Sequence, residues 1–485
     1  MTRTEIETNP DTASDVVAAL KLFIVSGTNI AIVKAPPGSG KTYTLVESLD
    51  SAIKKRLRIL VAAQTNNQVD EICLRIAERY RVRAGERRVI RFSSSGYEVP
   101  AGTGEEFDQK VEIVESKGAL PNGPCVVVST VAKLALTDFA NSFDLLYVDE
   151  AWQMAWADFL PLRHVADRYI LIGDPGQIPP TVAIEVDRWE ATPFPPHAPA
   201  PDLLLRNEQL DPFRTEFRLP MCRRLPHDSV ALVNSFYDFE FGAVAAPGER
   251  FLRPASLESL RVDGRRAQSS QSSKTSQSSQ TSLASRVDAA LARMWATETP
   301  WTTAMITHPT PETGLPVGTD TELAAVVVDV IRRLLELECV VATEPSEAAN
   351  PRRLLASDIG VVSTHNLMNA AINQRLLAVK KSFREIRVTT PERWQGLEKP
   401  VMIAVHPLSG VMAPSEFDLE TGRLCVMASR HRAACLFVTR DHIGRTLDRH
   451  LPAATQALGG ADITGRGHDV HRDFIDYHEE RNLVV

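Results

Sequence analysis

Short apolar runs alternate with amphipathic stretches in the first part of the chain. The runs rich in β-branched or aliphatic residues are Ile30–Val33, Ile59–Ala62, Val126–Ser129, Leu145–Val148 and Tyr169–Ile172. Stretches with helical periodicity, such as Asn67–Tyr80, lie between them. Alternation of strands with helices is typical of a parallel sheet that is covered by helices on both faces. The pattern therefore predicts an α/β domain.

A second set of elements follows further along the chain. Thr321–Leu337 has the periodicity of an amphipathic helix, and strands are expected near Ile359–Val362, Val401–Val405 and Cys435–Val438. After the proline-rich stretch Thr192–Asp202 we place a domain boundary near residue 215. The chain is thus expected to form two α/β domains with parallel sheets, over residues 1–215 and 216–485, the second with an insertion at about 240–320.

Residues 267–285 read AQSSQSSKTSQSSQTSLAS and contain almost no apolar side chains. Such a segment cannot bury enough apolar surface to offset the entropy that ordering costs. We predict a disordered, solvated linker here, with a protein-docking role as the alternative.

Composition narrows the class of protein. A chain of 485 residues is too long for one compact core, and 44% hydrophobic with 24% charged residues is ordinary for a globular protein. The formal net charge of −7 provides no global positive field, so any nucleic-acid site must be a local basic groove. The N-terminus is polar and no apolar run is long enough to span a membrane, so we expect a cytoplasmic protein.

The cysteines give no sign of a metal centre. None of them forms a C-x-x-C pair, which argues against a zinc module or an iron–sulfur cluster. We expect reduced, mostly buried thiols at Cys73, Cys125, Cys222, Cys339, Cys425 and Cys435.

The first strand runs into a loop of small residues that is followed by a helix. Backbone N–H groups of such a strand–loop–helix unit converge where phosphate oxygens can bind. Lys41 is suited to neutralise the β/γ-phosphates, and Thr42 to bind Mg²⁺ through its hydroxyl. Ala35 takes the place of the usual first glycine. The residues expected to hold ATP here are Pro36, Pro37, Gly38, Ser39, Gly40, Lys41 and Thr42.

Two further strands deliver polar side chains to the same edge of the predicted sheet. Asp149 and Glu150 follow Phe143–Val148, at a strand end where open α/β sheets bind ligands. Asp149 is suited to the Mg²⁺ shell, and Glu150 to orient and deprotonate the attacking water. Gln177 follows Tyr169–Ile172 and can sense the γ-phosphate without adding charge. The sequence thus predicts a nucleotide-hydrolysing site.

These motifs together resemble superfamily 1 helicases, in the class B branch that contains senataxin and the nonsense-mediated-decay helicase. The family pattern GPPGTGKT, DEAxQ and GDxxQLPP reappears here as APPGSGKT, DEAWQ and GDPGQIPP. The resemblance implies two RecA-like domains, ATP hydrolysis with Mg²⁺ between them, and 5′-to-3′ movement along a single strand. It also places Gln153 among the nucleotide-binding residues.

The second half of the chain extends the resemblance. Val388–Glu398 is similar to the family's VxTVDxFQGxE, which implies that Glu398 contacts the ribose and Gly396 the phosphates. Arg423–Arg430 is similar to RLNVALTR, which implies that Arg430 is an arginine finger. Leu219–Pro226 resembles LxxQYRMHP, and its register leaves two candidates for a second finger, Arg224 and Arg223.

Two family positions that read adenine are substituted. The tyrosine that stacks on the base is replaced by Cys222 or Arg223, depending on the register, and the upstream glutamine expected near Asp11–Val17 is absent. Strict preference for ATP therefore stays an open question.

Strand contacts are implied by the resemblance alone. Gln64–Asp70 is similar to the family's PSNxAVD, and polar side chains after strands bond phosphodiester groups in that family. Capping of turns or helices is the alternative role for such residues. The implied strand-contacting residues are Thr65, Asn66, Thr130, Ser363, Thr390 and Trp394.

The expected function is an ATP-dependent helicase or translocase that acts on single-stranded DNA or RNA. One alternative is an ATP-gated clamp or remodelling subunit that binds a strand without unwinding duplex. Another is a subunit of a larger defence or repair complex, tethered to a protein partner through the Ser/Gln-rich insertion.

Overall fold

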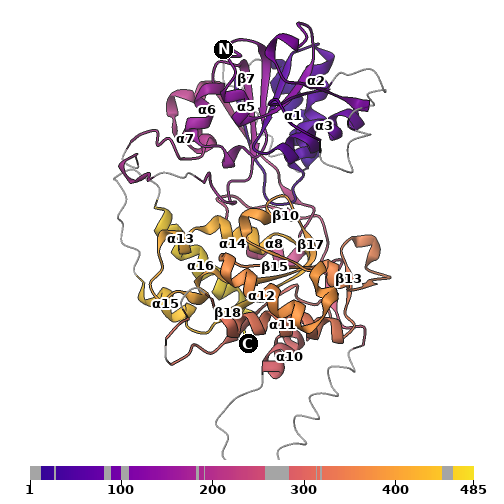
Figure 1. Ribbon diagram of the computed structural model, residues 1–485, viewed down its shortest axis with the longest axis vertical. Helices are drawn as coiled ribbons and strands as arrows, with labels where there is room; N and C mark the ends of the chain where they lie inside the picture. The colour runs from indigo at the N-terminus through magenta and orange to yellow at the C-terminus, as the bar shows by residue number, and fades with distance from the viewer. Residues whose placement is uncertain are drawn as a thin grey trace, which may run out of the picture. The chain divides into compact units, whose positions relative to one another are not determined.

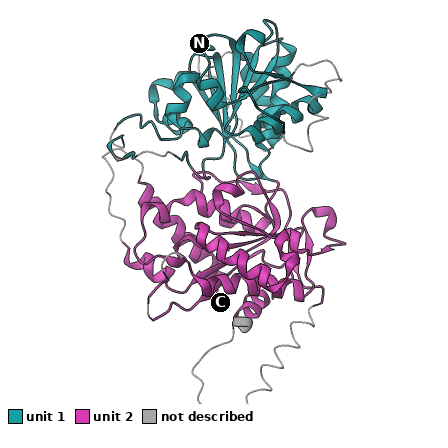
Figure 2. Ribbon diagram, in the orientation of Figure 1, with its two compact units in different colours: residues 1–175, 179–222 teal, residues 176–178, 223–485 magenta. Residues whose placement is uncertain are grey.

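The computed structural model describes residues 12–26, 29–80, 89–99, 107, 109–181, 185–189, 192–256, 283–312, 314–316, 319–450 and 462–485. The chain divides into two compact units (Figure 2). Unit 1 comprises Met1–Pro175 and Pro179–Cys222, and unit 2 comprises Gly176–Ile178 and Arg223–Val485. The expected boundary near residue 215 falls within β8 (Arg214–Arg218), which pairs with β1, so unit 1 extends further than the proline-rich stretch suggested.

Unit 1 is built on an eight-stranded sheet in which the neighbouring strands run parallel. In spatial order the strands are β4 (Val111–Val114), β3 (Val89–Phe92), β5 (Val126–Thr130), β2 (Ile59–Ala63), β6 (Phe143–Val148), β7 (Ala166–Gly173), β1 (Ile30–Lys34) and β8 (Arg214–Arg218). The short β9 (Met221–Cys222) ends the unit. The predicted parallel α/β sheet is confirmed.

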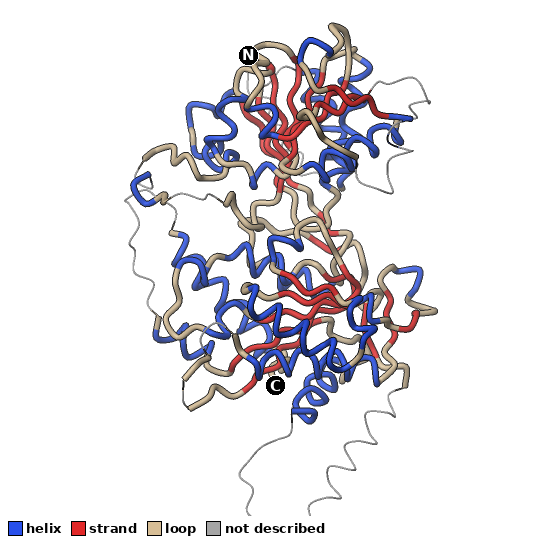
Figure 3. Tube along the Cα trace, viewed as in Figure 1, coloured by secondary structure: helices blue, strands red, loops and turns tan. Residues whose placement is uncertain are grey.

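Helices cover both faces of this sheet (Figures 1 and 3). One face carries α1 (Ala13–Ser26), α2 (Lys41–Lys54) and α3 (Asn66–Arg79), and the other carries α5 (Val131–Ala135), α6 (Trp156–Phe159) and α7 (Ala200–Arg206). Successive strand residues point to opposite faces. In β7, for example, Ile170 and Ile172 pack with the first group of helices, and Leu171 packs with the second.

Unit 2 contains a five-stranded parallel sheet. Its spatial order is β12 (Thr303–His308), β18 (His431–Arg440), β17 (Lys399–Val405), β15 (Ile359–Val362) and β16 (Arg387–Thr389). A small antiparallel sheet is formed by β11 (Phe251–Arg253), β13 (Val340–Ala342) and β14 (Arg352–Arg353). The strand β10 (Gly242–Ala243) lies between α8 and β11 in the sequence.

The helices of unit 2 also form two layers. α10 (Leu283–Met294), α11 (Thr321–Glu336) and α12 (Asn366–Val379) share one core with strand residues such as Val361 and Ile403. On the other face Phe474 of α16 (Ile463–Glu480) packs edge-on against Phe437 of β18, with ring centroids 4.7 Å apart. The remaining helices are α8 (His227–Asn234), α13 (Glu416–Leu419), α14 (Thr421–Ala428) and α15 (Ile443–Arg449).

The stretch 240–320, expected as an insertion, contributes directly to this core. β12 is an edge strand of the parallel sheet, and α10 packs beside it. Most of the predicted disordered segment 267–285 lies outside the described residues, and its last three residues begin α10. Among the described helices, none is both long and apolar enough to cross a membrane.

Candidate nucleotide site and nucleic-acid contacts

The loop of residues 35–40 after β1, the P-loop, has the backbone conformation that its small residues predict. Gly38 and Gly40 have φ angles of 66° and 93°, in the left-handed region that glycine adopts without strain. Gly40 is the N-cap of α2, and no side chain caps the helix there. The first N–H groups of α2 are thus left for another acceptor, as at an anion-binding helix terminus.

Lys41 lies between two carboxylates that come from neighbouring strands. Its Nζ is 3.4 Å from Oε1 of Glu150, which follows β6, and 3.9 Å from Oδ2 of Asp174, which follows β7. The side chain of Asp174 is fully buried. The parallel sheet thus brings a cation and two acids from three separate segments to its carboxyl edge.

Asp149 has the environment of a metal ligand. Its side chain is buried, and Oδ1 forms no hydrogen bond with the residues that the structure describes. Burial and then the adjacent Glu150 raise the pKa of Asp149 to about 7. A divalent cation would satisfy this carboxylate, and the half-buried Thr42 supplies a hydroxyl at the start of α2. The residues therefore fit Mg²⁺, which takes few protein ligands and completes its shell with water and phosphates.

Glu150 is held in an uncommon conformation. Its φ is 51°, and Gln153 donates a hydrogen bond from Nε2 to Glu150 Oε2 at 3.4 Å. Gly173 lies against the same turn, since a Cβ at Gly173 would come within 2.8 Å of the backbone N of Ala151. Asp174 was not predicted as a site residue. The sequence signal was available, because Asp174 follows a buried strand in the same way as Asp149.

Gln177 belongs to unit 2, although it follows β7 of unit 1 closely in the sequence. Gly422 in α14 lies against it so closely that a Cβ would stand 2.6 Å from the carbonyl carbon of Gln177. Gly176 similarly faces the ring of Tyr237. The chain therefore leaves the P-loop unit between Asp174 and Gly176 and returns after Ile178.

Arg224 and Glu398, two predicted nucleotide-contacting residues, are paired within unit 2. Arg224 Nε donates to Glu398 Oε2 at 2.6 Å, and Arg432 donates to Oε1 of the same carboxylate. Burial alone would raise the pKa of Glu398, but the charges and hydrogen bonds of Arg224 and Arg432 bring it below its ordinary value. Arg432 also donates to Glu344, which pairs with Arg250 at 3.2 Å.

The other candidate nucleotide-contacting residues of unit 2 lie close in the sequence to the ion pairs formed by Arg224, Glu398 and Arg432. Arg430 is buried, and its carbonyl oxygen accepts from Lys399 N at 2.9 Å. Gly396 has a φ of 75°, which favours glycine in the turn before Glu398. Arg223 is exposed, whereas Arg224 is half-buried. Of the two candidates, Arg224 is therefore the one that the fold holds in a defined orientation.

Cys222 is buried against the phosphate-binding loop. Its side chain is buried, and Sγ donates a hydrogen bond to the carbonyl oxygen of Pro37 in the P-loop at 2.9 Å. This contact ties β9 to the phosphate-binding loop. It also means that the residue next to the candidate fingers has no flat surface for a base.

Thr65 and Thr130, two predicted strand-contacting residues, cap helices. Thr65 Oγ1 accepts from Gln68 N, and Thr65 N donates to Gln68 Oε1, so both form the capping box of α3. Thr130 Oγ1 accepts from Lys133 N at the start of α5. Thr65 nevertheless remains exposed.

Asn66 combines a structural contact with exposure. Its Oδ1 accepts from Nη2 of Arg91 at 2.7 Å, and Arg91 is a buried cation that pairs with Asp70 at 3.0 Å. A buried charge needs such partners because its desolvation is costly. Asn66 itself is exposed at the start of α3, where its amide can also meet solvent or a ligand.

The candidates in unit 2 are less accessible. Ser363 is buried, and its Oγ donates to Asn369 Oδ1 at 2.9 Å. Thr390 is the largely buried N-cap of the turn η9 (Pro391–Trp394). Trp394 is 1% exposed, and its indole N–H donates to Val361 O at 3.1 Å. The expected contact of Trp394 with a strand is therefore replaced by a core position beneath the sheet edge.

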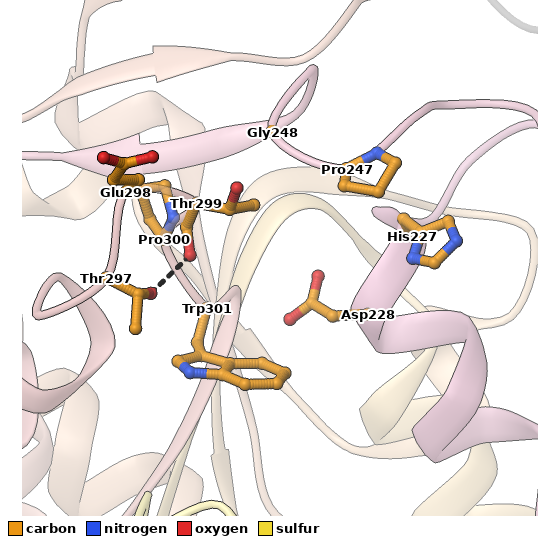
Figure 4. Close-up of a pocket in the computed structure, with 9 residues that line it drawn as sticks. All are labelled: His227, Asp228, Pro247, Gly248, Thr297, Glu298, Thr299, Pro300 and Trp301. Atoms are coloured by element: carbon orange, nitrogen blue, oxygen red, sulfur yellow. Dashed lines mark hydrogen bonds between the residues drawn. The ribbon is translucent and has the colours of Figure 1, made fainter.

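Two cavities lie within unit 2. One, of about 440 Å³, is lined by His227, Asp228, Trp301 and their neighbours (Figure 4), and contains none of the predicted site residues. Asp228 there is engaged by the backbone N–H and the hydroxyl of Thr302. The second, of about 340 Å³, includes Ser363 at the carboxyl end of β15. Among the described residues no group of three or more His, Cys, Asp or Glu is placed to hold a metal ion.

Comparison with known proteins agrees with the site. A family model described as "AAA domain" (AAA_11) matches residues 12–117 and 103–185, which contain the P-loop, Asp149, Glu150 and Gln177. The matched region lies almost entirely in unit 1. The part of the chain that holds the candidate site is thus similar to a P-loop ATPase domain.

Three similar proteins extend this comparison. The chain is 26% identical over 170 residues to the DNA replication ATP-dependent helicase/nuclease JHS1 of Arabidopsis thaliana, covering 33% of this chain and 12% of that protein. It is 42% identical over 55 residues to the DNA-binding protein SMUBP-2 of Mesocricetus auratus, covering 11% and 6%. The solved structure of the PRRSV helicase matches with a TM-score of 0.39 and 12% identity, covering 89% of this chain and 56% of that chain.

These matches make the first part of the chain similar to ATP-dependent helicases, and the AAA_11 match agrees with the resemblance to class B of superfamily 1. Each of the two units is an α/β domain with a parallel sheet, as the sequence predicted. The chain spans only a small part of the curated relatives that it matches, 12% of the first of them.

Proposed function

We propose that this protein is an ATP-dependent helicase or translocase that acts on single-stranded nucleic acid. The observation that carries the proposal is the position of Lys41 between Glu150 and Asp174, next to the uncapped start of α2. A P-loop with an adjacent Asp–Glu pair is the machinery of nucleotide hydrolysis. The similarity of this region to a DNA replication ATP-dependent helicase/nuclease supports nucleic acid as the partner.

In the proposed reaction, the N–H groups at the start of α2 and Lys41 bind the β/γ-phosphates. When ATP binds, Lys41 exchanges carboxylate partners for phosphate oxygens, which releases Glu150 to orient and deprotonate a water molecule. Asp149 and Thr42 would hold Mg²⁺, which would supply positive charge to neutralise the phosphate oxygens. Gln177 senses the γ-phosphate.

Unit 2 supplies cations in this proposal. Arg430 and one of the pair Arg224 and Arg223 stabilise the charge that develops on the transferred phosphoryl group. Glu398 and Gly396 contact the ribose and the phosphates. Because hydrolysis then depends on residues of both units, ATP binding and release can drive alternating grip on a strand, with 5′-to-3′ polarity as in the class B relatives.

The strand is proposed to bind through phosphodiester contacts from Thr65, Asn66 and Thr130 of unit 1. In unit 2 the proposed contacts are Ser363 and Thr390. Thr65 and Asn66 are exposed, whereas Ser363 and Thr390 are buried, so in unit 2 we expect the neighbouring backbone N–H groups to make most of the contacts with phosphates.

The test compares steady-state ATPase rates without nucleic acid and with single-stranded DNA or RNA of matched length. Stimulation by either strand supports the proposal, and the preferred strand identifies the substrate. A strand-displacement assay on a duplex with a 5′ or 3′ overhang then separates a helicase from a translocase or clamp. An ATPase rate that neither strand changes would contradict the proposal.

A further inference from the structure

The edge of the parallel sheet in unit 2 carries an exposed group of basic side chains. β16 is the last strand in the sheet order, and the 3₁₀ turn η8 (Lys381–Glu385) leads into it from α12. The exposed basic residues of this region are Arg375, Lys380, Lys381, Arg384, Arg387 and Arg393. In a chain with a formal net charge of −7, such a local concentration of cations is unusual.

The local geometry aligns two of these side chains, and a third follows them at the start of the next strand. In a 3₁₀ helix the residues i and i+3 lie directly above one another. Phe383 and Ile386, at that spacing, are buried in the core that α12 shares with the sheet. Lys381 and Arg384 are at the same spacing on the exposed side, and Arg387 follows them three residues later at the start of β16. We call Lys381, Arg384, Arg387 and Arg393 the cationic row.

The acidic residues nearby do not neutralise this row. Glu385 is the one exposed acid within η8, and Glu392 is already engaged by Arg423 Nε at 3.0 Å. Within the described part of the chain, neither Lys381 nor Arg384 forms an ion pair with a carboxylate. Exposed cations without acidic partners attract polyanions, and the release of counterions favours binding to phosphates.

The cationic row ends at the turn that contains Thr390. The guanidinium carbon of Arg387 lies 5.6 Å from the centre of the Trp394 ring, and Arg387 Nη2 approaches the carbonyl oxygen of Arg393 at 3.5 Å. Trp394 thus forms the buried floor beneath Arg387. The row therefore continues directly from the turn proposed to contact a strand.

We propose that the cationic row binds the phosphodiester backbone of a nucleic-acid strand and lengthens the strand-binding path of unit 2 beyond Thr390. The inference rests on the proposed function. Three residues of a 3₁₀ helix rise by about 6 Å, so Lys381 and Arg384 can meet neighbouring phosphates of an extended strand. Contacts of this kind depend on charge and spacing and carry no base specificity.

The experiment uses the full chain with Lys381→Glu and Arg384→Glu together. The matched control is Arg445→Glu with Arg449→Glu, which changes the net charge equally at two exposed positions of α15 in the same unit. α15 follows β18, which is separated from β16 by β17 and β15 in the sheet. Binding of fluorescent oligothymidine of about 8 and about 24 nucleotides is measured by anisotropy at several salt concentrations.

The row variant should bind the longer strand at least about tenfold more weakly than the parent, with a log–log salt slope shallower by about 1 to 2. Binding of the shorter strand, basal ATPase and the control variant should match the parent. Lys381→Gln with Arg384→Gln, which removes the charges without reversing them, should show a smaller loss in the same direction. A thermal melt by circular dichroism verifies that each variant is folded.

The outcomes separate the two proposals. If the parent binds neither oligonucleotide, the proposed function fails and the row proposal fails with it. If the parent binds and the row variant matches the control, the row proposal alone is overturned. Equal losses for both lengths would overturn the extended path. Parent-like strand binding with lost binding to polyglutamate would identify an acidic protein as the partner instead.

Discussion

Arg224 Nε donates a 2.6 Å hydrogen bond to Oε2 of Glu398 within unit 2. These residues are 174 positions apart in the sequence and come from two motifs that the family resemblance assigns to the nucleotide. Arg432 engages the other oxygen of Glu398, so the carboxylate orients two guanidinium groups at once. Replacement of any one of these three residues leaves a partly buried charge with fewer partners. The stabilities of the two motifs are therefore coupled.

Replacement of the candidate arginines separately should identify the finger. Arg224→Ala is expected to lower kcat of the strand-stimulated ATPase by about a thousandfold with a small change in KM, because a finger acts mainly in the transition state. Arg223→Ala is the adjacent, exposed control and should stay within a few-fold of the parent. A larger loss for Arg223→Ala would assign the finger to Arg223.

The P-loop and the catalytic carboxylate should fail in different ways. Lys41→Ala should abolish turnover and weaken nucleotide binding, because it removes the cation that neutralises the β/γ-phosphates. Glu150→Gln should retain nucleotide binding and lose at least about a hundredfold in kcat, because the water loses its base. Equilibrium binding of a fluorescent nucleotide and steady-state kinetics measure the two effects. Hydrolysis at the parent rate by Glu150→Gln would refute its assignment as the base.

The buried Cys222 predicts relaxed nucleotide choice. No aromatic ring stands at this position, and the thiol is hydrogen-bonded to the carbonyl oxygen of Pro37. One lost stacking contact is worth on the order of 1 kcal/mol. We therefore expect GTP and CTP to support activity within about tenfold of ATP. Values of kcat/KM for four nucleotides test this. A preference for ATP of several hundredfold would show that other residues read the base.

The start of α3 should be important for strand binding beyond its role as a cap. Thr65→Ala with Asn66→Ala should weaken strand binding and strand-stimulated ATPase together, with basal nucleotide affinity intact. The lost cap should cost about 1 kcal/mol of stability. Gln68→Ala is the matched control, because it breaks the other half of the capping box and leaves the Thr65 hydroxyl in place. Equal strand-binding defects in both variants would reduce Thr65 and Asn66 to a structural role.

Buried histidines should make unit 2 sensitive to acid. Burial lowers the pKa of His471 to about 3 and that of His478 to about 4. In the unfolded chain each histidine has a pKa of about 6.5. Above that pH the ring is neutral in both the folded and the unfolded chain, so its burial costs no free energy of unfolding. Below that pH the unfolded chain binds protons that the folded chain does not, so the free energy of unfolding falls by about 1.4 kcal/mol per pH unit for each histidine.

A single substitution checks this pH dependence. Neither ring nitrogen of His471 forms a hydrogen bond within the described part of the chain, so His471→Leu should be neutral or stabilising at pH 7.5. Between pH 6.5 and 5 it should remove about 1.4 kcal/mol per pH unit from the slope of stability. Urea unfolding at several pH values measures the slope, with the exposed His227→Asn as control. An unchanged slope would show that His471 is not the group that titrates.

Local pattern was sufficient for the loop after β1 and for the strands β1, β2, β5, β6, β7, β15, β17 and β18, whereas β3, β4, β8, β12 and β16 were not predicted. Each of the predicted features lies within a contiguous strand or strand–loop–helix segment, where hydrophobic period and glycine positions are decisive. The local sequence pattern did not predict where a segment packs with the other unit or joins the core of its own unit. Gly176–Ile178 follows β7 but packs with α14 and Tyr237, and β12 lies within a stretch that seemed to be an insertion.

The sequence by itself predicted which residues would hold a phosphate, a metal and an attacking water, because those side chains follow buried strands within a few positions. Only the tertiary structure decided which of them meet. Packing brought Asp174 to Lys41, paired Arg224 with Glu398, and placed the indole N–H of Trp394 on the carbonyl oxygen of Val361. Such contacts join residues far apart in the chain, and their geometry depends on how strands and helices pack, which no local pattern encodes.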